Sequence, residues 1–390
     1  MESNLISNLT EEFIINPAIF QNISSDLDQP ENKQLKFTLN KVDVSVANSL
    51  RRVILSEIPV FVLDSLDKED INEENIKIYE NTSILNNEII KQRLSCIPVN
   101  ITDFEEYEVN NYIVECNVTN NTNEKLIVTT EDFKIKNKVS GEYLPNNIVK
   151  TIFKKDVLTN EYIDLVYLQP TFNDNKGEKI HFECGFKISK AKENGSYNVV
   201  STCVYSFTRD EERIQEAWKQ IEDKLGDSRE DREIAYNDFM NLDANRITIP
   251  NSFDFIIQSI GIYNNHDLVK LGCEIMIDKY KNFISYIETN DDAIKENLEQ
   301  SEDSYLIKVE NEDYTFGKVL ENIIYINYFV EEKKLSYISM KKYHPHDTHC
   351  FILFSYINKT TRENIITDFK NISLMIIKIY ENIKSNITKV

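Results

Sequence analysis

The chain has 390 residues, which at about 150 residues per domain predicts two or three domains. Its 44 basic and 65 acidic residues give a net charge of −21. Because nucleic-acid-binding proteins gain affinity by neutralising phosphates, this balance makes the isolated chain a poor candidate for holding DNA or RNA. A hydrophobic content of 41% supplies enough apolar surface for folded cores and argues against wholesale disorder.

Six cysteines are spread along the chain without a Cys-x-x-Cys pair, which argues against structural zinc and a disulfide framework. The N-terminal residues lack the basic segment of a signal peptide. There is no run of 18 or more apolar residues, so no membrane span is predicted. We therefore expect a soluble, intracellular protein with no metal, no cofactor and no membrane partner.

The first hundred residues predict an N-terminal extension, 1–33, followed by the opening of a mixed module, 34–100. The alternating and helical apolar patterns define its elements. Pro59 and Pro98 signal where its two helices end. The expected elements are strands at 34–40, 58–66 and 75–79 and helices at 44–57 and 86–95.

From 101 to 190 the pattern changes to short β-like runs separated by Asn, Gly and Asp turns, which predicts a separate β-rich insert. A strand at 197–207 then returns to the first module, which resumes at 191 and ends at 288. The tract 210–238 is strongly charged with mixed signs and few apolar residues. It predicts a solvated helix or a helical hairpin. The expected strands of the insert include 112–118, 163–168 and 179–188.

Two long helices near the end of the chain carry heptad-like apolar seams, each of which needs a partner helix. The two seams can satisfy each other within one chain or can join two copies. An acidic link, 289–302, separates them. The first seam comprises Val269, Cys273, Met276, Tyr280, Phe283 and Ile287, and the second Ile365, Phe369, Ile372, Ile376, Ile379 and Ile383.

The stretch 303–390 predicts a second, smaller α+β module. Its helix 313–327 places Phe316 and Leu320 on one apolar face. The order of strand, amphipathic helix, strands and long seam helix repeats that of the first module. The predicted fold is therefore α+β, with two related halves forming an internal pseudo-dimer and the first half interrupted by the insert. The other elements expected here are strands at 305–310, 335–340 and 351–357 and a last helix at 361–386.

The helix 44–57 has one buried stripe, formed by residues that include Val46, Leu50 and Val53. Asn48 and Arg52 lie on the opposite face, and Arg51 flanks it. An exposed arginine beside an asparagine can bind a partner's carboxylates or carbonyls through its forked donors, although paired arginines on a helix are commonly a solvated face. Because Arg52 projects away from the stripe, we expect Arg52→Ala to leave the isolated fold near wild-type.

The amino-acid sequence of this region resembles the signature of the α-type subunits of DNA-dependent RNA polymerase. These are the bacterial α subunit and the third-largest subunit of RNA polymerase II. The closing strand 249–255 and the helix after Asn264 are similar to that family's dimerisation elements. The second module resembles the eleventh subunit of the same enzyme. The residues that carry the resemblance are Asn48-Ser49-Leu50-Arg51-Arg52, Glu57, Pro59, 81–85, Glu88, 93–98, 313–317, His344-Pro345 and His349.

The resemblance implies a noncatalytic assembly platform that holds the two large catalytic subunits of a polymerase, reaches DNA only through the complex and forms no homo-oligomer. The order of the two modules along the chain is that of a fusion of the two partner subunits, as expected of large DNA viruses. The location would be virion and host cytoplasm if viral, and otherwise the nucleus. The implied large-subunit contacts are Asn48, Arg51, Arg52, Glu88 and Arg93. The implied dimerisation seam is Val269, Cys273, Met276, Tyr280, Phe283, Phe316, Leu320, Ile365, Phe369, Ile372, Ile376 and Ile379.

Two departures from the family pattern matter. The insert lacks the cysteine cluster that binds zinc or an iron-sulfur cluster in some members, so no metal is expected there. In the second module, Lys318 and Glu321 stand where the signature has Asn and Arg. We therefore expect Arg51 and Arg52 of the first module to make the large-subunit contacts.

Two alternatives belong to other functional classes. One is a metal-dependent hydrolase that uses the loop containing His344, His346, His349 and Cys350, whose side chains are common metal ligands. The other is an acidic adaptor unrelated to transcription, in which the two seams form an intermolecular coiled coil.

Overall fold

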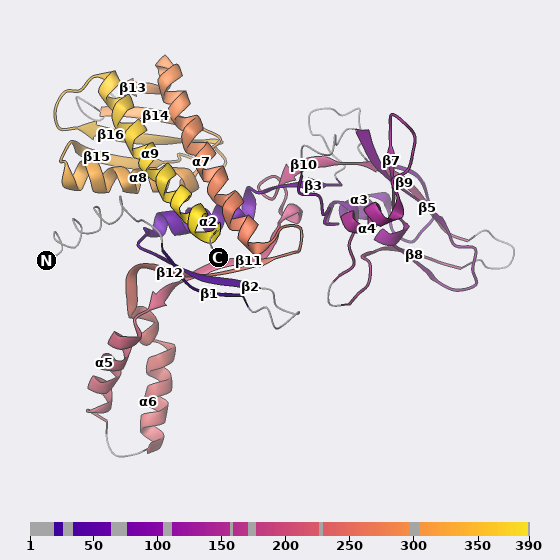
Figure 1. Cartoon of the computed structure of the whole chain (residues 1–390), viewed down its shortest axis with the longest axis horizontal. Coiled ribbons are helices and arrows are strands. Elements are labelled where there is room, and N and C mark those ends of the chain that lie inside the picture. The colour runs from indigo at the N-terminus through magenta and orange to yellow at the C-terminus, as the bar shows by residue number, and fades with distance from the viewer. Residues whose placement is uncertain are drawn as a thin grey trace.

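The computed structural model of the chain describes residues 19–25, 34–63, 76–103, 111–156, 159–170, 177–225, 229–296 and 304–388. These residues form a mixed α+β molecule with three hydrophobic cores. One core is shared by two sheet-and-helix halves, one lies in a β-rich unit, and a small one lies in a helical hairpin that projects from the body (Figure 1). No helix in the described ranges has the length and apolar character of a membrane span.

The first half is a four-stranded antiparallel sheet in the order β1-β2-β12-β11. Its apolar side chains alternate along β2, where Leu35, Phe37 and Leu39 are buried, so one face of the sheet covers the core. Two helices, α2 and α7, belong to the same half. The elements are β1 (Ile19–Ser25), β2 (Gln34–Asn40), α2 (Val44–Ser56), β11 (Val200–Arg209), β12 (Thr248–Ser259) and α7 (Asn265–Thr289).

The second half is built in the same way, with the sheet order β13-β14-β16-β15. A π-helical segment, Tyr325–Glu331, continues from the end of α8. The elements are β13 (Ile294–Glu296), β14 (Ser304–Glu310), α8 (Tyr314–Ile324), β15 (Leu335–Lys341), β16 (His349–Tyr356) and α9 (Arg362–Thr388).

The turns before α2 and α8, and the starts of these helices, correspond residue by residue. The turn after β2 has a positive φ at Lys41 (59°), and the turn after β14 has one at Asn311 (58°). Asp43 then caps α2 through the Ser45 amide, as Asp313 caps α8 through the Thr315 amide. Positions in α2 therefore match positions in α8 that are 270 residues later.

The long helices α7 and α9 match at a spacing of 100 residues. Every buried residue of α7 has a buried counterpart in α9. The expected repetition of strand and helix order is thus present in the structure. The buried pairs are Leu268 and Asp368, Val269 and Phe369, Gly272 and Ile372, Cys273 and Ser373, Met276 and Ile376, Ile277 and Ile377, Tyr280 and Tyr380, Phe283 and Ile383, and Ile287 and Ile387.

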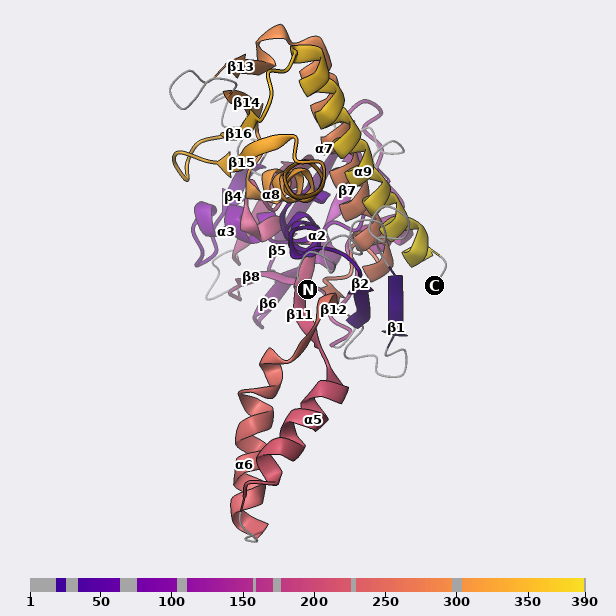
Figure 2. The ribbon, with the colours of Figure 1, turned by 90° about the vertical axis from the view of Figure 1, so that its left-hand side faces the viewer.

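The two seams face each other within one chain. Helices α7 and α9 lie side by side (Figures 1 and 2), and their apolar residues share the core of the two halves. Ion pairs join the start of each helix to the end of the other: Lys370 to Glu288 (2.7 Å) and Lys384 to Glu274 (2.6 Å). Of the two possibilities that the sequence left open, the structure has the intramolecular one.

The β-rich unit contains a four-stranded sheet, β4-β9-β5-β7, and a two-stranded sheet, β6-β8, around a separate core. It is joined to the first half by β3 (Pro59–Val62), which pairs with β10 (Lys187–Lys190). Its elements are β4 (Ile76–Asn81), α3 (Asn87–Ser95), β5 (Tyr112–Thr119), β6 (Leu126–Thr129), β7 (Lys134–Asn137), α4 (Asn146–Ile152), β8 (Asp164–Leu168) and β9 (Lys179–Gly185).

The pairing of β4 with β9 corrects the expected start of the insert. The sequence pattern places 34–100 in the first module, but Ile76, Ile90 and Leu94 lie in the core of the β-rich unit. The unit therefore includes the stretch from β4 to 101 as well as 101–190. The order of elements along the chain does not reveal that β4 belongs to the β-rich unit, because its partner strand β9 comes about a hundred residues later.

Two further expectations change at the sheet edges. Part of the extension 1–33 forms β1, which pairs with β2. Part of the link 289–302 forms β13, which pairs with β14. Both strands occupy the same edge position in their sheets. The rest of the link, from 297 on, lies outside the described residues.

The charged tract forms a helical hairpin of α5 (Glu211–Glu222) and α6 (Arg229–Asn241), which extends away from the two halves (Figures 1 and 2). Trp218 packs against Tyr236 and Phe239, with ring centroids 4.9 and 5.7 Å away. The helical-hairpin alternative is thus confirmed. Short 3-10 turns complete the described fold at Thr130–Asp132, Gly195–Tyr197, Ala244–Arg246 and Asp291–Ala293.

Candidate partner-docking site

Helix α2 lies at the centre of the shared core, against α7 and α8. The predicted stripe is confirmed, because Val46, Leu50 and Val53 are fully buried. The helix approaches α7 closely at Gly272, where an added Cβ would come within 2.9 Å of Ile54 Cγ1. These contacts fix the orientation of α2 and hence of the polar side chains on its other faces.

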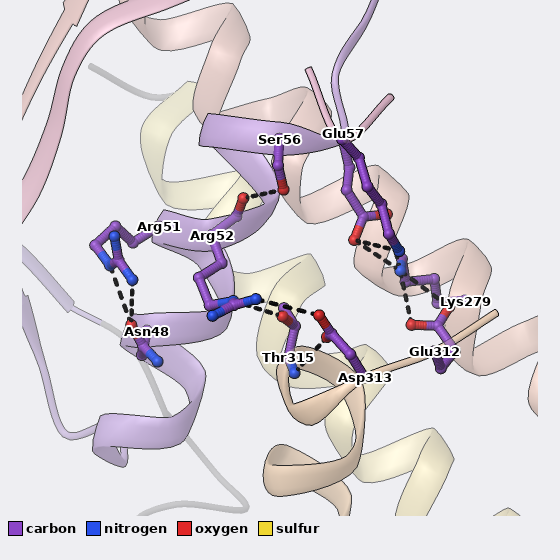
Figure 3. A network of polar contacts seen from close by, with 10 residues as sticks. Asn48, Arg51, Arg52, Ser56, Glu57, Lys279, Glu312, Asp313 and Thr315 are labelled. Atoms are coloured by element: carbon purple, nitrogen blue, oxygen red, sulfur yellow. Dashed lines mark hydrogen bonds and ion pairs between the residues drawn. The ribbon is translucent and has the colours of Figure 1, made fainter. Parts of the chain in front are cut away.

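Arg51 and Asn48 form one polar pair on α2. The Arg51 Nε and Nη2 groups donate to Asn48 Oδ1 over 3.0 and 2.9 Å. In Figure 3 the Arg51 guanidinium turns toward Asn48, whereas that of Arg52 turns toward Thr315 and Asp313. A guanidinium has five N–H donors in a fixed fork, and the two bonds to Asn48 hold it in one orientation. The pair can therefore present further donors to a carboxylate or a carbonyl of another protein.

Arg52 instead contacts the second half of the same chain. Its Nε donates to Thr315 Oγ1 (2.8 Å) and its Nη2 to Asp313 Oδ2 (3.1 Å), while Asp313 Oδ1 accepts the Thr315 amide (Figure 3). We name this group the Arg52 clasp. The expectation that Arg52→Ala leaves the isolated fold near wild-type did not include these contacts, because a helical projection shows which face a residue occupies but not what packs opposite.

The clasp sets the charge state of Asp313. Burial alone would raise the pKa of this carboxyl group, but hydrogen bonds from Thr315 and the Arg52 guanidinium together hold the pKa below its usual range. The ionised carboxylate therefore both caps α8 and binds α2. About 46% of the Arg52 side chain remains exposed, so its contact energy is moderated by water.

A second polar group, the Lys279 node, also joins the halves. Lys279 Nζ of α7 lies 2.8 Å from Glu57 at the end of α2 and 2.8 Å from Glu312 in the turn before α8 (Figure 3). Only 12% of the lysine side chain is exposed. Burial would lower the pKa of Lys279, but the two carboxylates outweigh it and raise the pKa. Neither Lys279 nor Glu312 is predicted as a contact residue from the sequence, since neither breaks the apolar pattern.

Two buried tyrosines, one from each long helix, contact the opposite half in an approximately symmetric way. Tyr280 of α7 donates its hydroxyl to the Phe316 carbonyl of α8 over 3.0 Å. Tyr380 of α9 lies 2.6 Å from Ser49 Oγ of α2, which donates to the Val46 carbonyl. The structure brings all predicted seam residues into the shared core: Val269, Cys273, Met276, Tyr280, Phe283, Phe316, Leu320, Ile365, Phe369, Ile372, Ile376 and Ile379.

The other two predicted contact residues lie in a different unit. Glu88 and Arg93 belong to α3, whose apolar side packs in the β-rich core. Glu88 is exposed, and Arg93 Nη1 donates to the Leu165 carbonyl over 2.6 Å. The five residues therefore form two regions, one on α2 and one on α3.

In the histidine loop the His344 and His346 rings lie with their centroids 5.0 Å apart, but Cys350 and His349 make other contacts. Cys350 is buried in β16 opposite Val309, and burial raises the pKa of its thiol to about 12. His344 Nδ1 accepts the His346 amide, and the His349 ring packs on Phe351. Within the part of the chain that the structure describes, no group of three or more His, Cys, Asp or Glu side chains is arranged to hold a metal. The hydrolase alternative is not favoured.

Comparison with known proteins identifies the family. Residues 36–280 match the RNA polymerase Rpb3/Rpb11 dimerisation domain. The chain belongs to this family. The matched stretch begins in β2 and ends in α7, so it includes α2, the β-rich unit and most of the first seam. The Rpb3/Rpb11 fold thus provides the frame in which the Asn48–Arg51 pair is held.

Several relatives extend the comparison. The chain is 34% identical over 210 residues to a conjugation stage-specific protein of Tetrahymena thermophila, a match that covers 50% of this chain and 62% of the relative. It is 21% identical to the DNA-directed RNA polymerase subunit Rpo3 of Methanosphaera stadtmanae, over 67% of this chain and 97% of that subunit. Identity to the same subunit of Pyrococcus furiosus is 24%, over 67% and 95%.

Proposed function

We propose that this chain is a noncatalytic subunit of a DNA-directed RNA polymerase and serves as the platform on which the two largest subunits assemble. The observation that carries the proposal is the Rpb3/Rpb11 match across residues 36–280, which contains α2 with its oriented Asn48–Arg51 pair. The relatives named as polymerase subunit Rpo3 match over nearly their whole length.

The geometry supports this role through rigidity. Helix α2 is fixed by α7, by α8 and by two polar groups, the Arg52 clasp and the Lys279 node. A guanidinium held in one orientation loses little entropy when a partner's carboxylate or carbonyl binds it. Arg51 with Asn48 is the proposed primary contact for a large subunit, and Glu88 and Arg93 on α3 are the proposed second contact region.

The second half is, in this proposal, the smaller dimerisation partner fused to the first. Its support is the equal strand order of the two sheets and the matched buried positions of α7 and α9. Linking the halves gives each a high effective concentration near the other and avoids a bimolecular step. The fused order and an Asn-, Ile- and Lys-rich composition are the support for a large DNA virus as the source, with the virion and host cytoplasm as the location, or otherwise the nucleus.

Purification of the tagged chain from its native cells tests the function. We expect two much larger proteins to co-purify and the complex to synthesise RNA on a DNA template. The isolated chain should neither synthesise RNA nor bind DNA tightly near physiological salt, because its net charge of −21 repels phosphate. RNA synthesis by the isolated chain, or a native complex without larger polymerase subunits, would refute the proposal.

A further inference from the structure

The two halves meet at two junctions that correspond by the internal repeat but differ in chemistry. At the first junction Lys279 of α7 pairs with Glu312, in the turn before α8. The corresponding residues of the second junction are Ile379, 100 positions after Lys279, and Val42, 270 positions before Glu312. Val42 is fully buried, and Ile379 is 2% exposed. One junction is therefore ionic and the other apolar.

We propose that this contrast is a pairing code, through which each half of the chain prefers the other half to a second copy of itself. The proposal concerns only how the halves pair, so it does not rest on the polymerase assignment. A fused chain needs such a code, because self-pairing of one half across two chains would leave the other halves free to link further copies.

The cost of each wrong pairing follows from the repeat. Two first halves would set Lys279 against Val42 at both junctions, so each Lys279 would lose its bonds to Glu312 and keep only its ion pair with Glu57 of its own half. Two second halves would set Glu312 against Ile379 at both junctions, so two buried carboxylates would lack a partner. Burying an unpaired charge is strongly unfavourable. Only the mixed pair matches ionic with ionic and apolar with apolar.

One of the two ion pairs between α7 and α9 adds to the same contrast. Glu274 of α7 pairs with Lys384 of α9 over 2.6 Å. The corresponding residues are Leu374 and Ile284, so this contact too has an ionic and an apolar version. Both charged side chains are about 40% exposed, and an exposed pair contributes little energy. The buried Lys279 node is therefore the main determinant.

The Arg52 clasp cannot supply this discrimination. Asp43 and Ser45 occupy the same capping positions as Asp313 and Thr315. Two first halves could therefore form an Arg52 clasp at each junction, which would favour self-pairing. Discrimination against that arrangement must come from residues that differ between the halves at the buried junction, and Lys279 with Glu312 are such residues.

An exchange experiment on a nicked chain tests the code. A protease site placed at residues 297–303 would be cut after the full chain has folded, and two isotopically distinct preparations would be mixed in mild urea. Native mass spectrometry then counts pairs of first with second halves and pairs of like halves. The wild-type should give mixed pairs almost alone. The variant K279I/E312V, which gives the first junction the apolar residues of the second junction at these two positions, should raise the share of like pairs by about tenfold or more.

A second variant keeps the result interpretable. K279M/E312Q removes both charges while nearly keeping side-chain length, and it should also raise the share of like pairs if K279I/E312V fails to fold. The matched control E274Q/K384M removes the exposed ion pair and should leave mixed pairs dominant. Like pairs at a comparable share in the wild-type, or mixed pairs alone in the charge-removed node variants, would overturn the proposal.

Discussion

Helices α2 and α8 occupy corresponding places in the two halves, yet their outward polar residues differ in charge. In α2 the guanidinium of Arg51 is held by the neutral Asn48. At the corresponding positions of α8, Lys318 and Glu321 form an ion pair of 2.6 Å. The first arrangement keeps its positive charge and spare donors, whereas the second neutralises itself. The buried stripe preserves the fold in both halves, while the exposed face is free to diverge, so docking should be a property of the first half.

Disrupting the core that the two halves share should lower the unfolding free energy more than any other change considered below. Ile372 and Ile376 of α9 are fully buried against the first half. Replacing both with Asp should cost at least about 5 kcal/mol of unfolding free energy, because two charges would be buried without partners. Urea unfolding followed by circular dichroism measures this. The control Leu374→Asp, at an exposed position of the same helix, should cost less than about 1 kcal/mol. A double variant as stable as this control would contradict the shared core.

Alanine substitutions of the neighbouring residues Arg52 and Arg51 should lower the unfolding free energy by different amounts. Arg52→Ala removes two hydrogen bonds to the second half and should lower the unfolding free energy by about 1 to 2 kcal/mol. Arg52→Lys should recover only part, since an ammonium cannot reproduce the fork. Arg51→Ala should cost less than about 0.5 kcal/mol, because the hydrogen bonds from Arg51 to Asn48 stay within α2. Chemical denaturation decides this, and equal losses for both alanine variants would disprove the distinction.

The clasp should also weaken in acid. The folded state holds the pKa of Asp313 below its value in the unfolded chain, about 4. Its contribution to stability is therefore complete above that pH and is lost as the pH falls through the lower, folded-state pKa. Asp313→Asn can still cap α8 but cannot ionise. The stability difference between wild-type and this variant should shrink between pH 6 and pH 3. A difference that stays constant over this range would show that the charge of Asp313 is unimportant.

The second junction offers a small gain of stability. Ser45 Oγ and Asn322 Nδ2 are buried without a hydrogen-bond partner, and they correspond to Thr315 and Arg52 of the clasp. Asn322→Arg should therefore reach Asp43 and Ser45 and gain about 0.5 kcal/mol over wild-type. Asn322→Ala serves as the control for removal of the amide. Melting temperatures should fall in the order Arg, wild-type and Ala; an Arg variant no more stable than wild-type would reject the second clasp.

Local patterns predicted much of this fold, and pairing between distant segments explains what they missed. The bounds of β2 and the buried stripe of α2 follow from periodicities of two and 3.6 residues. The edge strands β1 and β13 were missed, because their position depends on a neighbouring strand more than on their own residues. The π-helical segment after α8 carries no such periodic signal either.

In the candidate site, too, local patterns predicted which face a residue occupies but not its contacts with distant residues. The sequence located Asn48, Arg51 and Arg52 on the outer faces of α2, which a helical projection can do. It could not tell that Arg52 meets Asp313 or that Lys279 lies between Glu57 and Glu312, since these contacts join residues more than 200 positions apart, or helices and turns of different halves. A repeat comparison at spacings of 270 and 100 residues is the signal that could have found them.

A matched pair of variants, Arg51→Ala in α2 and Glu321→Ala in α8, separates the docking roles of the two helices. Each would be expressed with a tag in the native cells, and recovery of the larger polymerase subunits would be quantified against wild-type. Arg51→Ala should weaken their binding by about 2 to 5 kcal/mol while the isolated chain keeps its melting temperature. Glu321→Ala should leave recovery unchanged. Equal recovery with both variants would contradict the claim that the first half alone presents the docking face.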